Sequence, residues 1–271
     1  MYASVDLGIT NVDIAIRRQT GLEFFRRDTT RQSVLDQLCS VLSSFEDLTD
    51  PFKRVAVTGG RYRNLPDATE NIPLVKISEA EAIGRGGLAL SDLEEALIVS
   101  AGSGTAMVAA RRNDYAHITG SAVGGGTLQG LASLLLGTNN ALEIDRLAML
   151  GDANHADLTL VETVGDRVGK LPADANAVNF GRLAREMVDL TPADRAAGLV
   201  RLVGQVIAVI AINAARAEGL DTVVVIGHLV DLPSVRKVLT EVAGYYTAKI
   251  IVPDNPGAGT ALGALLALEG M

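Results

Sequence analysis

The sequence contains little of what disulfides, zinc centres and nucleic-acid binding require. Its 271 residues include one cysteine, Cys39, and three histidines. A single cysteine excludes a disulfide within the chain, and the histidines lack the Cys/His spacing typical of a zinc site. These features fit a reducing compartment, so we expect the protein to be cytoplasmic.

An excess of basic residues is also absent. The chain has 24 Lys and Arg against 32 Asp and Glu, which gives a net charge of −8. Because affinity for nucleic acid depends on clustered Lys and Arg, we expect no nucleic-acid partner. The N-terminus opens into a strand pattern without a basic segment, and the apolar runs are shorter than the roughly 18 residues of a spanning helix. We therefore expect no signal peptide and no membrane contact.

What the sequence does contain is a regular alternation of strand and helix patterns, with 48% hydrophobic residues. "MYASVDLGITNVDIAIRR" predicts two strands joined by a polar tip, with Val12, Ile14 and Ile16 facing the core. A helix, a short strand ending at "VTGG", another strand and a helix starting near Ser78 follow. "ALIVSAGSGTAMVAARR" then repeats the strand, tip, strand pattern. The succession predicts an α/β fold.

The C-terminal half has a larger share of helix. Thr191 and Pro192 are placed to begin a long helix that ends before Gly219, and "DTVVVIGH" and "AKIIVPD" predict strands around another helix. "GTALGALLALEGM" predicts a closing helix. The segment "QVIAVIAINAA" of the long helix is apolar nearly all round, which indicates burial on more than one side. It suits either a dimer core or a core helix within one lobe.

Three glycine-rich tips suggest anion binding. "DLGIT" (6–10), "AGSGT" (101–105) and "GGGTLQG" (124–130) offer backbone N–H groups, and Thr10, Ser103 and Thr105 add hydroxyl donors. Asp6, before the first tip, would suit a Mg²⁺ ion that keeps most of its waters. Each tip alone is weak, because a glycine pair after a strand is commonly a tight turn and no Rossmann or P-loop spacing is present.

The order of the three tips resembles the actin, hexokinase and heat-shock-chaperone ATPase superfamily. "VDLGITN" is similar to its first phosphate loop, "VSAGSGT" to the second and "VVVIGH" (223–228) to its adenosine strand. The resemblance implies a two-lobed, ribonuclease H-like α/β fold with ATP in the cleft between the lobes. We expect residues 1–95 and 96–271 to form the lobes, with the closing helix packing back on the first.

Within that superfamily the chain resembles the type II pantothenate kinases. The shared blocks are "VTGG" (57–60), "SEAEAIGRG" (78–86), "AGSGT", "GSAVGGGTLQGL" (120–131), "GDANHADL" (151–158), "NAVNFG" (176–181), "IGH" (226–228) and "GAGTALGAL" (257–265). The resemblance implies ATP- and Mg²⁺-dependent phosphorylation of pantothenate, or a close relative, at a primary hydroxyl. That reaction is the first step of coenzyme A synthesis, and the family further implies a homodimer.

The resemblance also implies roles for individual residues. Glu79 would be the general base on the acceptor hydroxyl, although a carboxylate there could simply complement the helix dipole. His117 and Gly120 would contact the acceptor with Glu79, and Asp6 would hold the metal. The nucleotide would be bound by Asp6, Gly8, Ile9, Thr10, Gly102, Ser103, Gly104, Thr105, Gly124, Gly125, Gly126, Thr127, Gln129 and Gly227. The amides of the three consecutive glycines are expected to start a helix and face the phosphates.

Two positions depart from the family pattern. Ile9 stands where the first loop usually has a second glycine, and His117 stands where the family has an arginine before the glycine-rich segment. Arg111 or Arg112 could replace that arginine, His117 could serve another acceptor or be an ordinary strand residue, or transfer could be lost. The alternatives to pantothenate kinase are therefore a non-catalytic nucleotide sensor, a reactivating ATPase, or a kinase for a different small alcohol.

Overall fold

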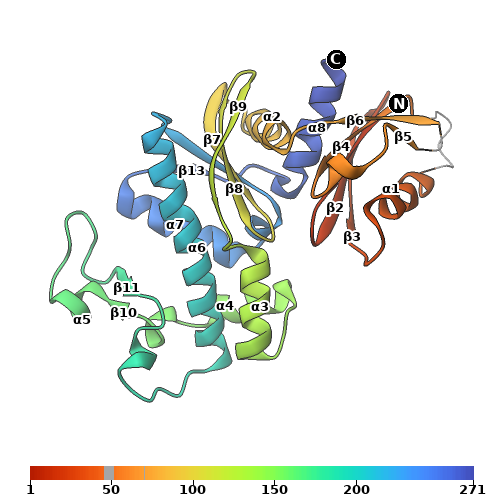
Figure 1. Cartoon of the computed structure of the whole chain (residues 1–271). Coiled ribbons are helices and arrows are strands. Elements are labelled where there is room, and N and C mark those ends of the chain that lie inside the picture. The colour runs from red at the N-terminus through yellow and green to blue at the C-terminus, as the bar shows by residue number, and fades with distance from the viewer. Residues whose placement is uncertain (46–51, 70) are drawn as a thin grey trace.

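The fold is built on two sheets that share one plan. A computed structural model describes residues 1–45, 52–69 and 71–271. The first sheet has the order β3-β2-β1-β4-β6-β5 and the second β13-β12-β7-β8-β9. In each, three antiparallel strands are followed by two parallel ones, and the first sheet ends with the short antiparallel strand β5 (Figure 1). The repeated hairpin pattern in the sequence thus corresponds to a repeated half-structure.

The strands of the first sheet are β1 (Tyr2–Leu7), β2 (Asn11–Arg18), β3 (Gly21–Asp28), β4 (Arg54–Gly59), β5 (Ala68–Thr69) and β6 (Ile72–Lys76). Those of the second are β7 (Glu95–Ala101), β8 (Thr105–Arg111), β9 (Asp114–Ser121), β12 (Thr222–Ile226) and β13 (Lys249–Ile251). A separate pair consists of β10 (Leu158–Thr159) and β11 (Asn176–Val178).

The helices are α1 (Val34–Ser43), α2 (Glu79–Ser91), α3 (Gly125–Leu136), α4 (Ala141–Leu150), α5 (Leu160–Val164), α6 (Pro192–Ala217), α7 (Pro233–Tyr246) and α8 (Gly259–Glu269). The expected caps are present. Ser78 accepts a hydrogen bond from the Glu81 amide at the start of α2, and Thr191 accepts one from the Asp194 amide at the start of α6.

Helices cover both faces of both sheets, as parallel central strands require. On the first sheet, α1 contributes Leu38, Val41 and Leu42 to the core beneath β1, β2 and β4. On the second, α6 and α7 form the largest core together with β7, β8 and β12. Strand β2 is buried on both faces: Ile14 packs toward α1, and Ala15 packs against Ala261 and Leu265 of α8.

Helices α2 and α8 each pack on the sheet of the other half. Helix α2 follows β6 of the first sheet, yet Ile83 and Leu88 pack against the second sheet. Helix α8 ends the chain, yet Ala264 and Leu268 pack with Ala56 of β4. The division at residue 95 remains a prediction, and the packing shows that α2 belongs to the second sheet by contact although it precedes that sheet in sequence.

Helix α6 has the length and hydropathy of a membrane-spanning helix, with a mean hydropathy of 1.8 over its most apolar window. The sequence analysis did not anticipate this, because interspersed polar residues break its apolar runs. In the structure 56% of that window is buried within the protein, and α6 is a core helix packed against α3, α4 and α7. This agrees with the intralobe alternative considered for this segment.

Helices α2 and α8 cross each other at glycines. A Cβ at Gly86 of α2 would lie 1.8 Å from the carbonyl oxygen of Gly259, and one at Gly263 of α8 would lie 1.8 Å from that of Ala82. No methyl group fits at either position, so the two helices touch backbone to backbone. Their crossing joins the two halves of the molecule.

We predict that Gly86→Ala lowers the free energy of unfolding by at least about 2 kcal/mol, because the added methyl group forces the helices apart. Gly130 of α3 is the matched control. A Cβ there has no neighbour within 4 Å, and the alanine gains helix propensity. Gly130→Ala should leave stability unchanged or raise it by up to about 1 kcal/mol. Urea unfolding of both variants measures the difference, and equal stabilities would contradict a tight crossing.

Candidate functional site

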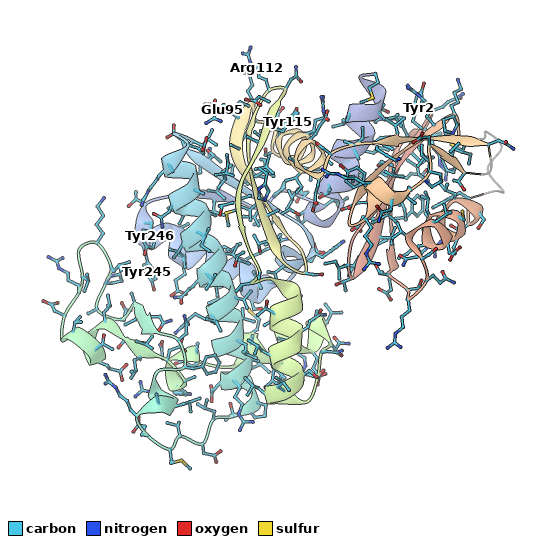
Figure 2. The ribbon with its side chains drawn as sticks, in the orientation of Figure 1. Tyr2, Glu95, Arg112, Tyr115, Tyr245 and Tyr246 are labelled. Atoms are coloured by element: carbon cyan, nitrogen blue, oxygen red, sulfur yellow. The ribbon has the colours of Figure 1, made fainter. Side chains whose placement is uncertain are left out.

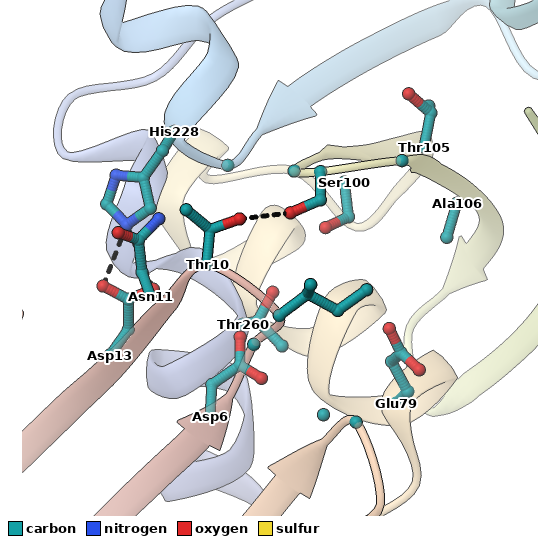
Figure 3. Close-up of a pocket in the computed structure, with 18 of the residues that line it drawn as sticks. Asp6, Thr10, Asn11, Asp13, Glu79, Ser100, Thr105, Ala106, His228 and Thr260 are labelled. Carbon is teal, nitrogen blue, oxygen red and sulfur yellow. Dashed lines mark hydrogen bonds and ion pairs between the residues drawn. The ribbon is translucent and has the colours of Figure 1, made fainter. Parts of the chain in front are cut away.

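The tips of the two repeated hairpins meet across a cleft. Thr10, between β1 and β2, places its Oγ1 2.6 Å from the Oγ of Ser103, between β7 and β8. Beneath this contact lies a cavity of about 430 Å³ (Figure 3). Its lining includes most of the predicted site residues: Asp6, Gly8, Ile9, Thr10, Glu79, Gly102, Ser103, Gly104, Thr105 and Gly227. Gly59, Gly60 and Thr260, which were not predicted as site residues, also line it.

A second cavity of about 590 Å³ adjoins the first and shares Thr10, Asn11, Gly102, Ser103 and His228 with it. Its other walls come from β3, the start of α3, the start of α4 and the segment after β12. They include the predicted residues Gly125, Gly126 and Gln129, together with Arg26, Asp28, Leu128, Asn139, Asn140, Ala141, Leu142, Leu229, Asp231 and Leu232. The two cavities therefore lie side by side, with the contact between Thr10 and Ser103 in the lining of both.

The consecutive glycines have a different function from the one expected. The amide of Gly125 donates to the carbonyl of Gly102 (2.8 Å), and that of Gly126 donates to the carbonyl of Ser103 (2.9 Å). A Cβ at Gly124 would lie 2.7 Å from the Ser103 oxygen. The expectation that these amides face phosphates is corrected: they hold the second hairpin tip against α3. Their contribution to the cleft is the position of that tip.

Two predicted hydroxyls are likewise engaged elsewhere. Thr105 donates to the carbonyl of Val123 at 2.8 Å, and Thr127 donates to that of Ala122 at 3.0 Å. Both bonds secure the turn between β9 and α3. Thr105 still lines the first cavity with its remaining atoms, whereas Thr127 and Gly124 line neither cavity.

Asp6 and Glu79 project into the first cavity from different elements (Figure 3). Asp6 lies on β1, and Glu79 is the exposed first residue of α2. Among the described residues Glu79 has no hydrogen bond or ion pair, whereas Glu81, two residues on, pairs with Arg85 at 3.0 Å. Glu79 is therefore free to act on a ligand, and its neighbour is not.

Burial and, to a smaller extent, the nearby carboxylates of Asp13 and Glu79 raise the pKa of Asp6 to about 7, against the opposing effect of His228. Within the described ranges no group of three or more His, Cys, Asp or Glu side chains is arranged to hold a metal. A metal at Asp6 would consequently keep most of its waters or take ligand oxygens.

The arginines suggested as replacements at the acceptor side do not reach the cleft. Arg111 donates to the carbonyl of Glu218 at 2.6 Å, and Arg112 pairs with Glu94 at 3.1 Å. Figure 2 shows Arg112 and Tyr115 at the far end of the β8–β9 hairpin. Tyr245 and Tyr246, at the end of α7 in the same figure, also line neither cavity.

His117 and Gly120 lie on β9, outside both cavities. A Cβ at Gly120 would lie 2.5 Å from the Thr105 carbonyl oxygen, so this glycine is required by strand packing. His117 is exposed and pairs in register with Val108, on the face of the sheet that α2 covers. The structure brings Glu79 to the cleft but leaves His117 on the adjoining surface.

Sequence reasoning missed Asp13 and His228. Nε2 of His228 lies 2.9 Å from Oδ1 of Asp13, and its Nδ1 lies 2.7 Å from Oδ2 of Asp231. Burial alone would lower the pKa of His228, but the hydrogen bonds to both carboxylates outweigh it and raise the pKa to about 9. The available signal was an aspartate within the apolar strand "VDIAI", where a charged group requires a partner.

The Fumble family model matches residues 91–252. The chain belongs to this family, that of the type II pantothenate kinases. It is 27% identical to the type II pantothenate kinase of Staphylococcus aureus (strain bovine RF122 / ET3-1), over 98% of each chain. It is 26% identical to that of Staphylococcus haemolyticus (strain JCSC1435), over 98% of this chain and 99% of the relative.

Solved structures share the fold. The activator of the 2-hydroxyisocaproyl-CoA dehydratase from Clostridium difficile, with bound ADPNP, aligns with a TM-score of 0.66 and 18% identity over 98% of this chain and 93% of that one. A ROK hexokinase from Thermus thermophilus aligns with a TM-score of 0.61 and 14% identity, over 100% and 99% of the chains. The fold is the two-lobed, actin-like ATPase fold expected from the motif order.

We predict that Asp6→Asn stabilises the protein in the absence of nucleotide and divalent metal. The pKa of Asp6 is raised from 3.8 to about 7 in the fold, so the native state becomes less stable as pH rises through that interval. At about pH 8 the variant should gain about 2 kcal/mol in the free energy of unfolding, and at about pH 4 almost nothing. Urea unfolding with EDTA at both pH values measures this, and a gain independent of pH would contradict it.

Proposed function

We propose that this protein is an ATP-dependent kinase that phosphorylates a primary hydroxyl of pantothenate or a close relative, the first step of coenzyme A synthesis. The observation that carries the proposal is the placement of Asp6, Glu79 and both glycine-rich tips around one cavity. Family membership and the kinase names of the relatives support a phosphotransferase. The identity of the acceptor rests on those names.

The proposed nucleotide extends through both cavities. Its phosphates would lie in the first cavity, against the backbone of Gly8–Thr10 and Gly102–Gly104, and its nucleoside in the second, between Gln129 and Leu229. Solved structures of this fold with bound ADPNP or AMPPNP support ATP as the donor. Ile9 is 81% exposed at the first tip and lines the first cavity, so its side chain borders the proposed phosphate space.

The residues present fit a magnesium ion beside Asp6. The carboxylates of Asp13 and Glu79 raise the pKa of Asp6, and His228 offsets their charge in part. When bound, Mg²⁺ would neutralise charge on the transferring phosphoryl group. Asp6 would hold it through water, because a single protein carboxylate with several waters suits this ion.

The proposed general base is Glu79. Its carboxylate would accept the proton of the acceptor hydroxyl as the hydroxyl oxygen bonds to the γ-phosphorus, and the bond from that phosphorus to the bridging oxygen of ADP breaks. The start of α2 fixes its backbone, and the absence of an ion pair leaves the carboxylate available. No arginine lines the first cavity among the described residues, so backbone donors and the metal would stabilise the phosphoryl group.

We expect Glu79→Gln to lower kcat about 10²- to 10⁴-fold, because the amide cannot accept the hydroxyl proton. ADPNP affinity should change less than about threefold. Glu81→Gln is the matched control: its carboxylate pairs with Arg85 and lines neither cavity, so kcat should stay within about twofold. A coupled ADP-release assay with pantothenate and a panel of alcohols measures these rates.

The same assay separates the competing functions. Acceptor-independent ATP hydrolysis that Glu79→Gln leaves intact would contradict the kinase mechanism and favour a reactivating ATPase. Nucleotide binding without turnover on any acceptor would favour a sensor. Turnover with another alcohol but not with pantothenate would agree with Glu79 as the general base and would assign a different acceptor to the enzyme.

We also propose a homodimer in which the arm formed by residues 151–190 contributes to the interface. The arm exposes apolar side chains, including Val164, Val178 and Met187, at its surface. Multi-angle light scattering should find the wild type as a dimer and Val164→Asp/Met187→Asp as a monomer, since buried charges oppose association. A monomeric wild type would contradict the assembly.

A further inference from the structure

One histidine connects the two sheets across the mouth of the cleft. His228 follows β12 of the second sheet, and Asp13 lies on β2 of the first. Nε2 of His228 is 2.9 Å and 3.0 Å from the two carboxylate oxygens of Asp13, which is only 8% exposed. Nδ1 is 2.7 Å from Asp231. Because an acceptor lies at each ring nitrogen, both nitrogens must carry protons, and the ring is an imidazolium.

The imidazole of His228 packs closely against neighbouring residues. A Cβ at Gly257 would lie 2.2 Å from the ring, so a glycine is needed for the imidazole to pack there. Nη1 of Arg26 from β3 lies 3.4 Å from Nδ1, while the same guanidinium donates to Asn11 at 2.7 Å. The charged groups facing His228 are thus Asp13, Asp231 and Arg26, with Asp6 acting at longer range.

The position of the ring relates it to the nucleotide. His228 and Asn11 line both cavities, so the bridge stands where the proposed phosphate and nucleoside spaces join. Strands β2 and β3 supply Asn11, Arg26 and Asp28 to the second cavity, and the His228 segment supplies the wall facing them. A bond between β2 and that segment therefore sets the separation of the two walls.

We propose that His228 is a positioning residue that holds the cleft closed around ATP, by joining Asp13 of the first sheet to the segment His228–Asp231 that follows β12 of the second sheet. This inference rests on the proposed nucleotide site. It assigns control of the width of the cleft to one side chain. Without the bridge, β2 and β3 would have to be ordered against the second sheet on each binding event, which weakens affinity. The chemical step, which depends on Asp6 and Glu79, is left largely unchanged.

The test is ADPNP binding, measured by calorimetry, which requires neither an acceptor nor transfer. His228→Asn should weaken ADPNP about tenfold and raise KM for ATP similarly, with kcat within about twofold. His155→Asn is the matched control: His155 pairs with Asp194 at 3.1 Å on the arm and lines neither cavity. It should bind ADPNP as the wild type does. If the wild type binds no ADPNP, the proposed nucleotide site is wrong. If the wild type binds ADPNP and His228→Asn binds it equally tightly, the site stands and the proposed role of His228 is wrong.

A double-mutant cycle separates the bridge from general destabilisation. Asp13→Asn combined with His228→Asn should weaken ADPNP no more than His228→Asn alone, because either change breaks the same link. Additive losses would overturn the proposal. Should His228→Asn fail to fold, Asp231→Asn, at an exposed carboxylate, tests the other bond.

The pH dependence gives an independent readout. Since the pKa of His228 is raised to about 9, wild-type affinity for ADPNP should fall between about pH 8 and pH 10 as the imidazolium loses its proton. The profile of His228→Asn should be flat over this interval. A parallel decline in both proteins would assign the effect to other groups and contradict the role of His228.

Discussion

The backbone contact between α2 and α8 determines how the rest of this structure is arranged. Gly86 and Gly263 allow a close approach of the two helices. The carbonyl oxygens of Gly259 and Ala82 lie where a side chain at these two positions would begin. Since α2 packs on the second sheet and α8 on the first, their crossing fixes both sheets relative to each other. Glu79 is the first residue of α2, so its distance from Asp6 on β1 depends on this crossing. The relative position of these two carboxylates therefore depends on two glycines that are distant from both of them in the sequence.

The same principle operates at the hairpin tips. The amides of Gly125 and Gly126 hold the Gly102–Ser103 backbone, and a side chain at Gly124 would collide with that backbone. Ser103 then meets Thr10 from the other half. Glycine is needed at these positions because two chain segments must touch, and only secondarily because a ligand approaches. A family motif and a structural requirement are in this case the same residues.

The sequence predicted the fold and much of the cleft because both depend on local patterns. Period-two alternation located β1 and β2, Ser78 and Thr191 located helix starts, and the tips that came after strands became cleft residues. The packing of α2 and α8 on each other's sheets was not predictable. Gly86 contacts Gly259, and no local sequence pattern indicates a contact between residues so far apart in the chain. His117 was assigned by alignment with a motif position, and a strand position cannot reveal that its side chain lies outside the cavities. Asp13 and His228, 215 residues apart, likewise become partners only in three dimensions.

The negative charge in the cleft explains why an imidazolium at the bridge between the two halves is favourable. Asp6, Asp13 and Glu79 place three carboxylates near the site where a polyphosphate is proposed to bind, and like charges at this spacing oppose both folding and ligand entry. His228 neutralises Asp13 directly, which leaves Asp6 as the carboxylate in need of a cation. Asp13 is thus paired with a cation within the protein, whereas for Asp6 the proposed Mg²⁺ would supply one. Below about pH 9 the cleft gives Asp13 a directly hydrogen-bonded counter-ion, and Asp6 feels the same imidazolium only at longer range.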